Sequence, residues 1–99
     1  MVVHIVCWDL NDTVNKEDYP AVKSKIKELL EALTGQVPGL ISARVIDRPL
    51  ASGNTEVALV CELESAEALS AYQIHPAHLE AAGFVRSVTC NRRCLDYEV

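Results

Sequence analysis

Hydrophobic and polar residues alternate along the first ten positions of the chain. The even positions would share one face of an extended segment, and they carry His4, Val6, Trp8 and Leu10. The odd positions form the other face, with Val3, Ile5, Cys7 and Asp9. A period of two with β-branched and aromatic residues predicts a strand over residues 2–10.

A different spacing follows the polar turn at residues 11–13. Apolar residues recur three or four positions apart, at Val22, Ile26, Leu29, Leu30 and Leu33. This spacing predicts a long amphipathic helix that Asn15 can cap and that ends near Gly35. Its charged residues read as a solvated face.

Two further strands are predicted in the middle of the chain. Pro38 and Gly39 form a turn, after which residues 40–46 read as a strand. Residues 49–54 are rich in turn formers, and residues 57–64 are the clearest strand, apolar on most of both faces.

The last third combines helical and extended patterns. Ser65 can cap a short helix that breaks at Pro76, because a proline disfavours the helical conformation at the residue before it. We expect a further helical turn over residues 77–82, ending at Gly83. Residues 84–90 and 94–99 then read as a last strand or a pair of strand segments, interrupted by the polar residues 91–93.

The predicted order is β, α, β, β, α, β, which is typical of an α+β protein with a four-stranded antiparallel sheet and helices on one face. Helices on one face leave the other face to water, yet the strands at 2–10 and 57–64 are apolar on both faces. Something must cover the second face. We therefore expect a homodimer that buries sheet against sheet.

Length, composition and charge exclude several classes of function. The 99 residues are enough for one domain spanning 1–99, and the apolar share of 49% fits a folded globular protein. A net charge of −5 argues against binding to nucleic acid or to an anionic membrane surface. The longest strictly apolar run, residues 57–61, is far too short to span a bilayer, and no secretory signal is recognisable. These features predict a cytoplasmic protein.

Metal and cofactor sites are not predicted. The four cysteines read as reduced thiols, and Cys90 and Cys94 lie too far apart along an extended strand to share one metal ion. His75 and His78 have a spacing that could bind one metal ion, but no third ligand stands nearby. The Arg92-Arg93 pair reads as a solvated loop. No glycine-rich phosphate loop is present, which argues against a nucleotide cofactor. We expect a protein that works without a cofactor.

Several segments together resemble the stress-responsive dimeric α/β-barrel (Dabb) family over essentially the whole chain. They include Val3-His4-Ile5-Val6, Pro38-Gly39, Ser65-Ala66-Glu67-Ala68-Leu69, Tyr72 with His75-Pro76-Ala77-His78, and Asp96-Tyr97. The resemblance implies a ferredoxin-like βαββαβ protomer whose sheets pair into a barrel in a homodimer. This agrees with the homodimer expected from the two strands that are apolar on both faces.

The resemblance also implies site residues. One plant member of the family is a polyketide cyclase that uses a tyrosine and a histidine, and these roles would fall on Tyr72 and His78. The His4 position would line the pocket, with Val6, Trp8 and His75 as further ligand-binding candidates. Other members are stress-induced proteins without a known substrate, and the wider superfamily includes monooxygenases, haem enzymes and isomerases.

Chemistry allows two interpretations of the same residues. A neutral histidine can remove a proton next to a carbonyl while a phenol hydrogen-bonds the developing enolate, which suits a cyclase, isomerase or lyase. Alternatively, Tyr72 is a core aromatic residue, and His75 and His78 are packing or capping residues. We therefore expect a small barrel that binds a hydrophobic or aromatic molecule, with an enzyme using Tyr72 and His78 as the alternative.

Overall fold

The structure, a computed structural model, describes residues 1–99 and confirms the predicted βαββαβ order, with the second helical region divided in two. The strands are β1 (Val2–Leu10), β2 (Leu40–Ile46), β3 (Val57–Leu63) and β4 (Thr89–Glu98). The helices are a short 3-10 turn, η1 (Lys16–Asp18), and α1 (Tyr19–Glu31), α2 (Ala66–Ile74) and α3 (Pro76–Val88).

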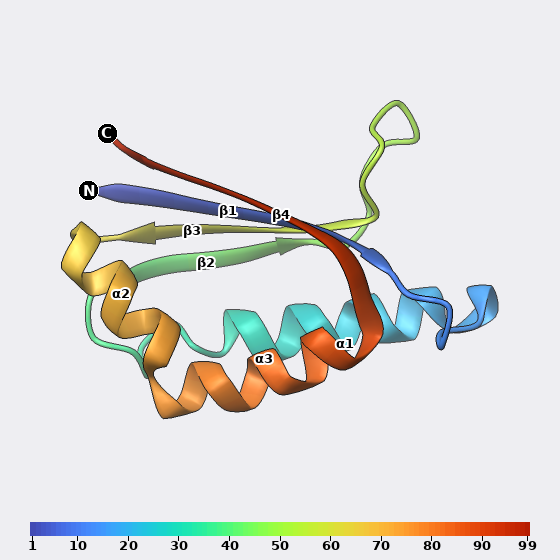
Figure 1. Ribbon diagram of the computed structural model, residues 1–99, viewed down its shortest axis with the longest axis horizontal. Coiled ribbons are helices and arrows are strands. Elements are labelled where there is room, and N and C mark those ends of the chain that lie inside the picture. Colours follow the sequence, from blue (N-terminus) through green and yellow to red (C-terminus); the bar gives the residue numbers. More distant parts are fainter.

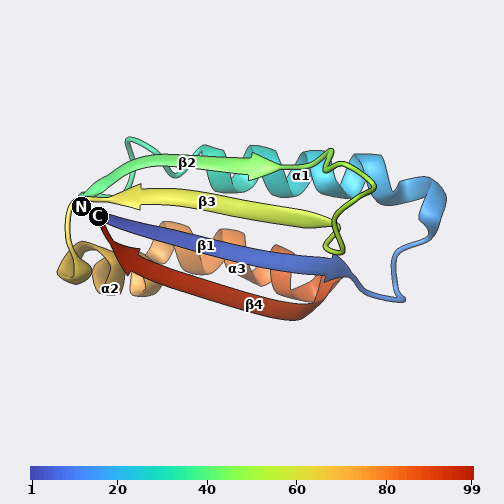
Figure 2. The same ribbon diagram turned by 90° about the horizontal axis from the view of Figure 1, so that it is seen from above.

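The strands form one antiparallel sheet in the order β2-β3-β1-β4. Helices α1 and α3 run along one face of this sheet, and α2 lies at its end (Figure 1). No helix covers the opposite face, which faces the viewer in Figure 2. The architecture is therefore the ferredoxin-like α+β fold that the sequence predicted.

Strand register sorts side chains onto the two faces. His4 of β1 is paired with Cys61 of β3 and Asp96 of β4, so these three side chains point toward the helices. Ile5 is paired with Val60 and Leu95, which lie on the bare face. The central strands therefore carry apolar residues on both faces, as the sequence predicted.

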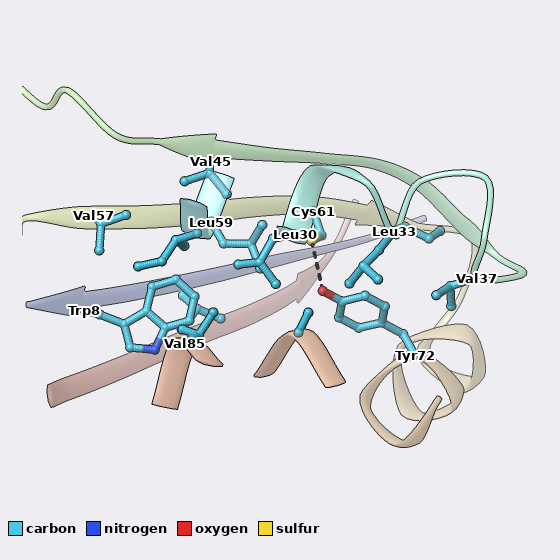
Figure 3. Packing of buried hydrophobic residues seen from close by; sticks show 14 of the residues in the cluster. Trp8, Leu30, Leu33, Val37, Val45, Val57, Leu59, Cys61, Tyr72 and Val85 are labelled. Atoms are coloured by element: carbon cyan, nitrogen blue, oxygen red, sulfur yellow. Dashed lines mark hydrogen bonds between the residues drawn. The ribbon is translucent and has the colours of Figure 1, made fainter. Parts of the chain in front are cut away.

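The main core lies between the sheet and the helices. Sixteen buried residues form one cluster, and the largest of the fully buried side chains is that of Tyr72 (Figure 3). Ile26 and Leu30 of α1 and Val85 of α3 meet the inner face of the sheet in this cluster. Each such aliphatic side chain contributes about 1.5–3 kcal/mol by leaving water.

Two helix boundaries match the capping chemistry that the sequence predicted. Ser65 caps α2, because its hydroxyl oxygen accepts a hydrogen bond from the Ala68 amide at 3.1 Å. Pro76 separates α2 from α3 and occupies the first turn of α3, where its missing N–H costs nothing. The predicted capping of the first helix by Asn15 is wrong, since its side chain makes no capping hydrogen bond and α1 begins only at Tyr19.

The prediction of strand over residues 84–88 is wrong. Helix α3 continues through Gly83 to Val88, since Ala81 and Val85 lie one helical turn apart and are both buried against the core. A single glycine does not end a helix whose apolar face continues beyond it. The polar residues 91–93 belong to β4, where Asn91 has a positive φ of 54° beside a register shift.

Gly39 marks a close approach between the start of β2 and helix α2. Its φ is +85°, and a β-carbon at this position would lie 2.7 Å from Cβ of Ala68. Only glycine fits both the backbone conformation and the space. None of the helices is both long and apolar enough to cross a bilayer.

Candidate functional site

A cavity of about 380 Å³ opens between the helices and the inner face of the sheet. This volume falls within the range of about 300–1,000 Å³ that is usual for small-molecule pockets. Its lining comes from the sheet, α1, α2 and α3, and consists of His4, Val6, Trp8, Leu30, Leu59, Gln73, His78, Ala82, Val85, Arg86 and Arg92. The pocket thus lies within one chain, on the helix-covered face of the sheet.

Strand β1 supplies one wall of the pocket. His4, Val6 and Trp8 are buried and project from the same face, because successive side chains alternate along a strand. The structure brings together all three of these predicted ligand-binding residues in the cavity lining. Trp8 offers an indole ring to an apolar ligand.

Helix α3 places His78 on the facing wall. The carbonyl oxygen of Gln73 lies 3.1 Å from Nδ1 of His78. A carbonyl can only accept, so Nδ1 carries the proton in the neutral ring and Nε2 keeps its lone pair. Burial lowers the pKa of His78, and the nearby His4, Arg86 and Arg92 lower it further, against the Gln73 contact. His78 is therefore a neutral imidazole at pH 7 with one basic nitrogen.

Tyr72 packs against His78 but does not line the cavity. The two ring centroids are 4.5 Å apart, and the Tyr72 side chain is fully buried. Its hydroxyl points to Cys61, whose thiol donates a hydrogen bond to it at 3.9 Å (Figure 3). Burial raises the pKa of Tyr72 well above its ordinary value and that of Cys61 to about 11. Both groups are thus protonated at neutral pH.

His75 has a different position from the other predicted site residues. It is not part of the cavity lining, and its Nδ1 accepts a hydrogen bond from the Ala77 amide at 3.1 Å. The side chain thereby caps the N-terminus of α3. This contact corresponds to the capping interpretation of His75.

One polar cluster joins the two ends of the chain at the pocket. The Nδ1 atom of His4 is hydrogen-bonded to Oδ1 of Asp96, and Sγ of Cys94 lies 3.6 Å from each of these atoms. The carboxylate of Asp96 is an acceptor, so it holds the His4 proton on Nδ1. These three side chains lie close enough together to bind one metal ion through a nitrogen, a sulfur and an oxygen atom.

Sequence reasoning missed Gln73, Arg86 and Arg92 as lining residues. It assigned Arg92 to a solvated loop, but Arg92 lies in β4, two positions from Cys94 and on the same face of the strand. Only the pairing of β4 with β1 places Arg92 at the pocket. The sequence carries no sign of that register.

Comparison with known families gives one match. The sequence model of a family described as "Stress responsive A/B Barrel Domain" (Dabb) matches residues 2–99. No curated protein matches the sequence significantly.

Solved structures share the fold over nearly the whole chain. A dimeric protein of unknown function with a ferredoxin-like fold from Bacteroides fragilis has 28% identity and a TM-score of 0.89, over 99% of this chain and 95% of that one. A dimeric ferredoxin-like protein of unknown function from Thermobifida fusca has 25% identity and a TM-score of 0.77, over 99% and 90%.

A third structure is similar in fold alone. SnoaB, a cofactor-independent oxygenase from Streptomyces nogalater, has 11% identity and a TM-score of 0.76, over 99% of this chain and 91% of that one. The same arrangement of helices and strands therefore occurs in a protein described as an oxygenase.

Proposed function

The chain belongs to the stress-responsive A/B barrel domain (Dabb) family, and from this membership and the pocket geometry we propose that it is a dimeric barrel protein binding a small hydrophobic or aromatic molecule. The observation that carries the proposal is the cavity of about 380 Å³ beside the buried hydrophobic cluster. Apolar walls with a few convergent polar groups are typical of ligand sites.

The pocket walls supply two kinds of contact to a ligand. Val6, Trp8 and Leu59 offer apolar contact from the sheet, and the imidazoles of His4 and His78 offer polar contact. Both imidazoles have Nδ1 occupied by protein partners, which fixes their orientation before any ligand arrives. A preorganised pocket of this kind loses little conformational entropy on binding.

A thermal-shift experiment with a blocked pocket tests the proposal. Ala82 lines the cavity and is half-buried, so Ala82→Trp would fill the space that a ligand needs. Ala71→Trp is the matched control, because Ala71 is exposed on α2 and does not line the cavity.

The panel consists of small aromatic amides, phenols and lactones. A ligand at about a hundred times its Kd adds roughly 2.7 kcal/mol to the free energy of unfolding, a shift of several degrees in Tm. The shift should persist in Ala71→Trp and disappear in Ala82→Trp. Equal shifts in both variants would place binding elsewhere and contradict the proposal.

The bare face of the sheet is the proposed dimer interface. Ile5 and Val60 lie there beside the exposed side chains of Leu95 and Tyr97. Contiguous apolar side chains on one face are typical of interaction sites. The structures from Bacteroides fragilis and Thermobifida fusca are both described as dimeric. A second copy seated on this face would bury the apolar residues of both sheets.

The state of His78 favours a second candidate function, a cofactor-independent cyclase or isomerase. Its Nε2 is a basic nitrogen held on the pocket wall and could take a proton from a carbon next to a carbonyl. In the geometry described above, the Tyr72 hydroxyl faces Cys61, so the proposed hydrogen-bond role of Tyr72 requires that hydroxyl to leave the thiol and turn to the substrate.

Turnover by variants separates the two functions. For any carbonyl compound that the panel identifies as a ligand, His78→Gln should abolish conversion while Tyr72→Phe should reduce it by a factor of about 10²–10³. Conversion by His78→Gln within a factor of two of the unaltered protein would remove the enzyme hypothesis. The binding proposal would stand.

A further inference from the structure

Two solvent-exposed arginines line the mouth-side of the pocket without forming a salt bridge. Arg86 comes from the last turn of α3 and Arg92 from β4, so two separate elements converge on the cavity. Neither residue takes part in a salt bridge, since the two salt bridges of the structure join His4 to Asp96 and Lys27 to Glu31. Every other Lys and Arg except Lys27 also lacks a salt bridge, so Arg86 and Arg92 are distinguished by their position at the cavity.

No carboxylate lines the cavity to balance these charges. The other polar lining residues are His4, Gln73 and His78, and the remaining lining is apolar. Asp96 is nearby, but its Oδ1 is bound to His4. Arg86 and Arg92 line the same cavity as His78, and their positive charges lower the pKa of that imidazole.

Arg93 has the same side chain as Arg92 but does not line the pocket, so the position of Arg92 in β4 is what brings it there. Arg93 follows Arg92 directly but pairs with Cys7, whose side chain lies on the bare face of the sheet. The two neighbouring arginines therefore project to opposite sides of β4. Of these two neighbours, only Arg92 lines the cavity.

We propose that the ligand of this pocket is an anion, a small aromatic or aliphatic carboxylate whose apolar body lies against Val6, Trp8 and Leu59 and whose carboxylate is bound by Arg86 and Arg92. This inference rests on the proposed binding function and adds the chemical class of the ligand. A guanidinium matches a carboxylate with two parallel hydrogen bonds. The apolar wall supplies the binding free energy of the ring or chain, and the two arginines select its charge.

The experiment compares carboxylates with their uncharged amides of the same shape. The pairs are benzoate and benzamide, phenylacetate and phenylacetamide, and 4-butylbenzoate and 4-butylbenzamide. Binding is followed by the fluorescence of Trp8, the only tryptophan, which lines the cavity, and by calorimetry. We expect at least one carboxylate to bind about tenfold more tightly than its amide, and this preference to shrink as ionic strength rises.

Substitutions test whether the two arginines cause the preference for carboxylates over amides. Arg92→Gln and Arg86→Gln should each weaken carboxylate binding about three- to tenfold and leave amide binding within twofold. Arg93→Gln is the matched control: it removes the same charge from the other face of the strand and should leave both classes unchanged.

The possible results distinguish a failure of the anionic-ligand inference from a failure of the proposed binding function on which it rests. Amides that bind as tightly as carboxylates would overturn the anionic ligand and leave the binding function in place. A carboxylate preference lost equally in Arg93→Gln would also overturn it, because the effect would then follow net charge and not the pocket. If neither class binds at the solubility limit, the binding function itself fails, and the anionic ligand with it.

Discussion

His4 and Asp96 are hydrogen-bonded to each other although 92 positions separate them in the chain. His4 is almost fully buried, whereas the Asp96 side chain is 39% exposed. The pair links the first strand to the last at the edge of the pocket. It also fixes which nitrogen of His4 carries the proton.

Removal of the Asp96 carboxylate should lower the stability of the folded protein. In Asp96→Ala the buried Nδ1–H of His4 loses its acceptor, and we expect a loss of about 1 kcal/mol in the free energy of unfolding. Asp96→Asn keeps an acceptor oxygen and should cost less. Urea denaturation measures both variants, and equal stability of Asp96→Ala and the unaltered protein would show that the pair contributes nothing.

The lowered pKa of His78 makes stability depend on pH. Burial disfavours the charged imidazole, so the unfolded chain binds more protons than the folded one below the ordinary histidine pKa of about 6.5. The folded protein should therefore lose stability as the pH falls from about 7.5 to about 5.5. His78→Gln should show a smaller loss in denaturation experiments at both pH values. Identical losses would contradict the lowered pKa.

Tyr72 should matter for stability through its ring more than through its hydroxyl. Tyr72→Ala empties a fully buried position and should cost about 3–5 kcal/mol. Tyr72→Phe removes only the contact with the Cys61 thiol and should cost at most about 1 kcal/mol. Chemical denaturation of the two variants checks the ratio. A similar cost for both would mean that the hydroxyl holds the ring in place.

Two glycines with similar backbone angles should respond differently to alanine. Gly35 and Gly39 have φ of +88° and +85°, but only at Gly39 would a β-carbon meet another atom, Cβ of Ala68. Gly35→Ala should cost about 1–2 kcal/mol from the backbone alone. Gly39→Ala should cost a further 1–3 kcal/mol, approximately, because α2 must move. Thermal unfolding compares them, and equal costs would mean that α2 shifts freely.

The bare face of the sheet should control assembly. Leu95 is 59% exposed there, and Leu95→Glu would place a charge in the proposed sheet-on-sheet interface. We expect this variant to be a monomer by light scattering and the unaltered protein to be a dimer. Ile74→Glu is the control, because Ile74 is exposed at the end of α2 and away from the sheet. A monomeric unaltered protein would refute the dimer.

The elements that the sequence predicted best are those whose signals are local. Alternation fixed β1 at residues 2–10 and placed His4, Val6 and Trp8 on one face, and capping chemistry located Ser65 and Pro76 at their helix boundaries. The error at residues 84–88 arose where a glycine and β-branched residues outweighed the helical spacing of Ala81 and Val85. Tertiary packing decided that segment.

The candidate site was predictable only in part. His78 and the β1 residues have recognisable patterns, but the approach of Arg92 and Asp96 depends on the register between β1 and β4, which are more than 75 positions apart. The orientation of the Tyr72 hydroxyl toward Cys61 depends on contacts across the core. Long-range pairing of this kind leaves no periodic trace in a single sequence.

The two ends of the described chain lie side by side at one end of the sheet (Figures 1 and 2). The amide of Val99 donates a hydrogen bond to the carbonyl of Met1 at 2.9 Å. A short glycine-rich linker could therefore join these ends, and the chain could be opened instead in the exposed loop between β2 and β3. In such a circular permutant β4 would run directly into β1 as a hairpin. The pocket wall that carries His4 and Arg92, with Asp96 at its edge, would then be made from neighbouring residues, so its formation would no longer wait for closure of a long loop.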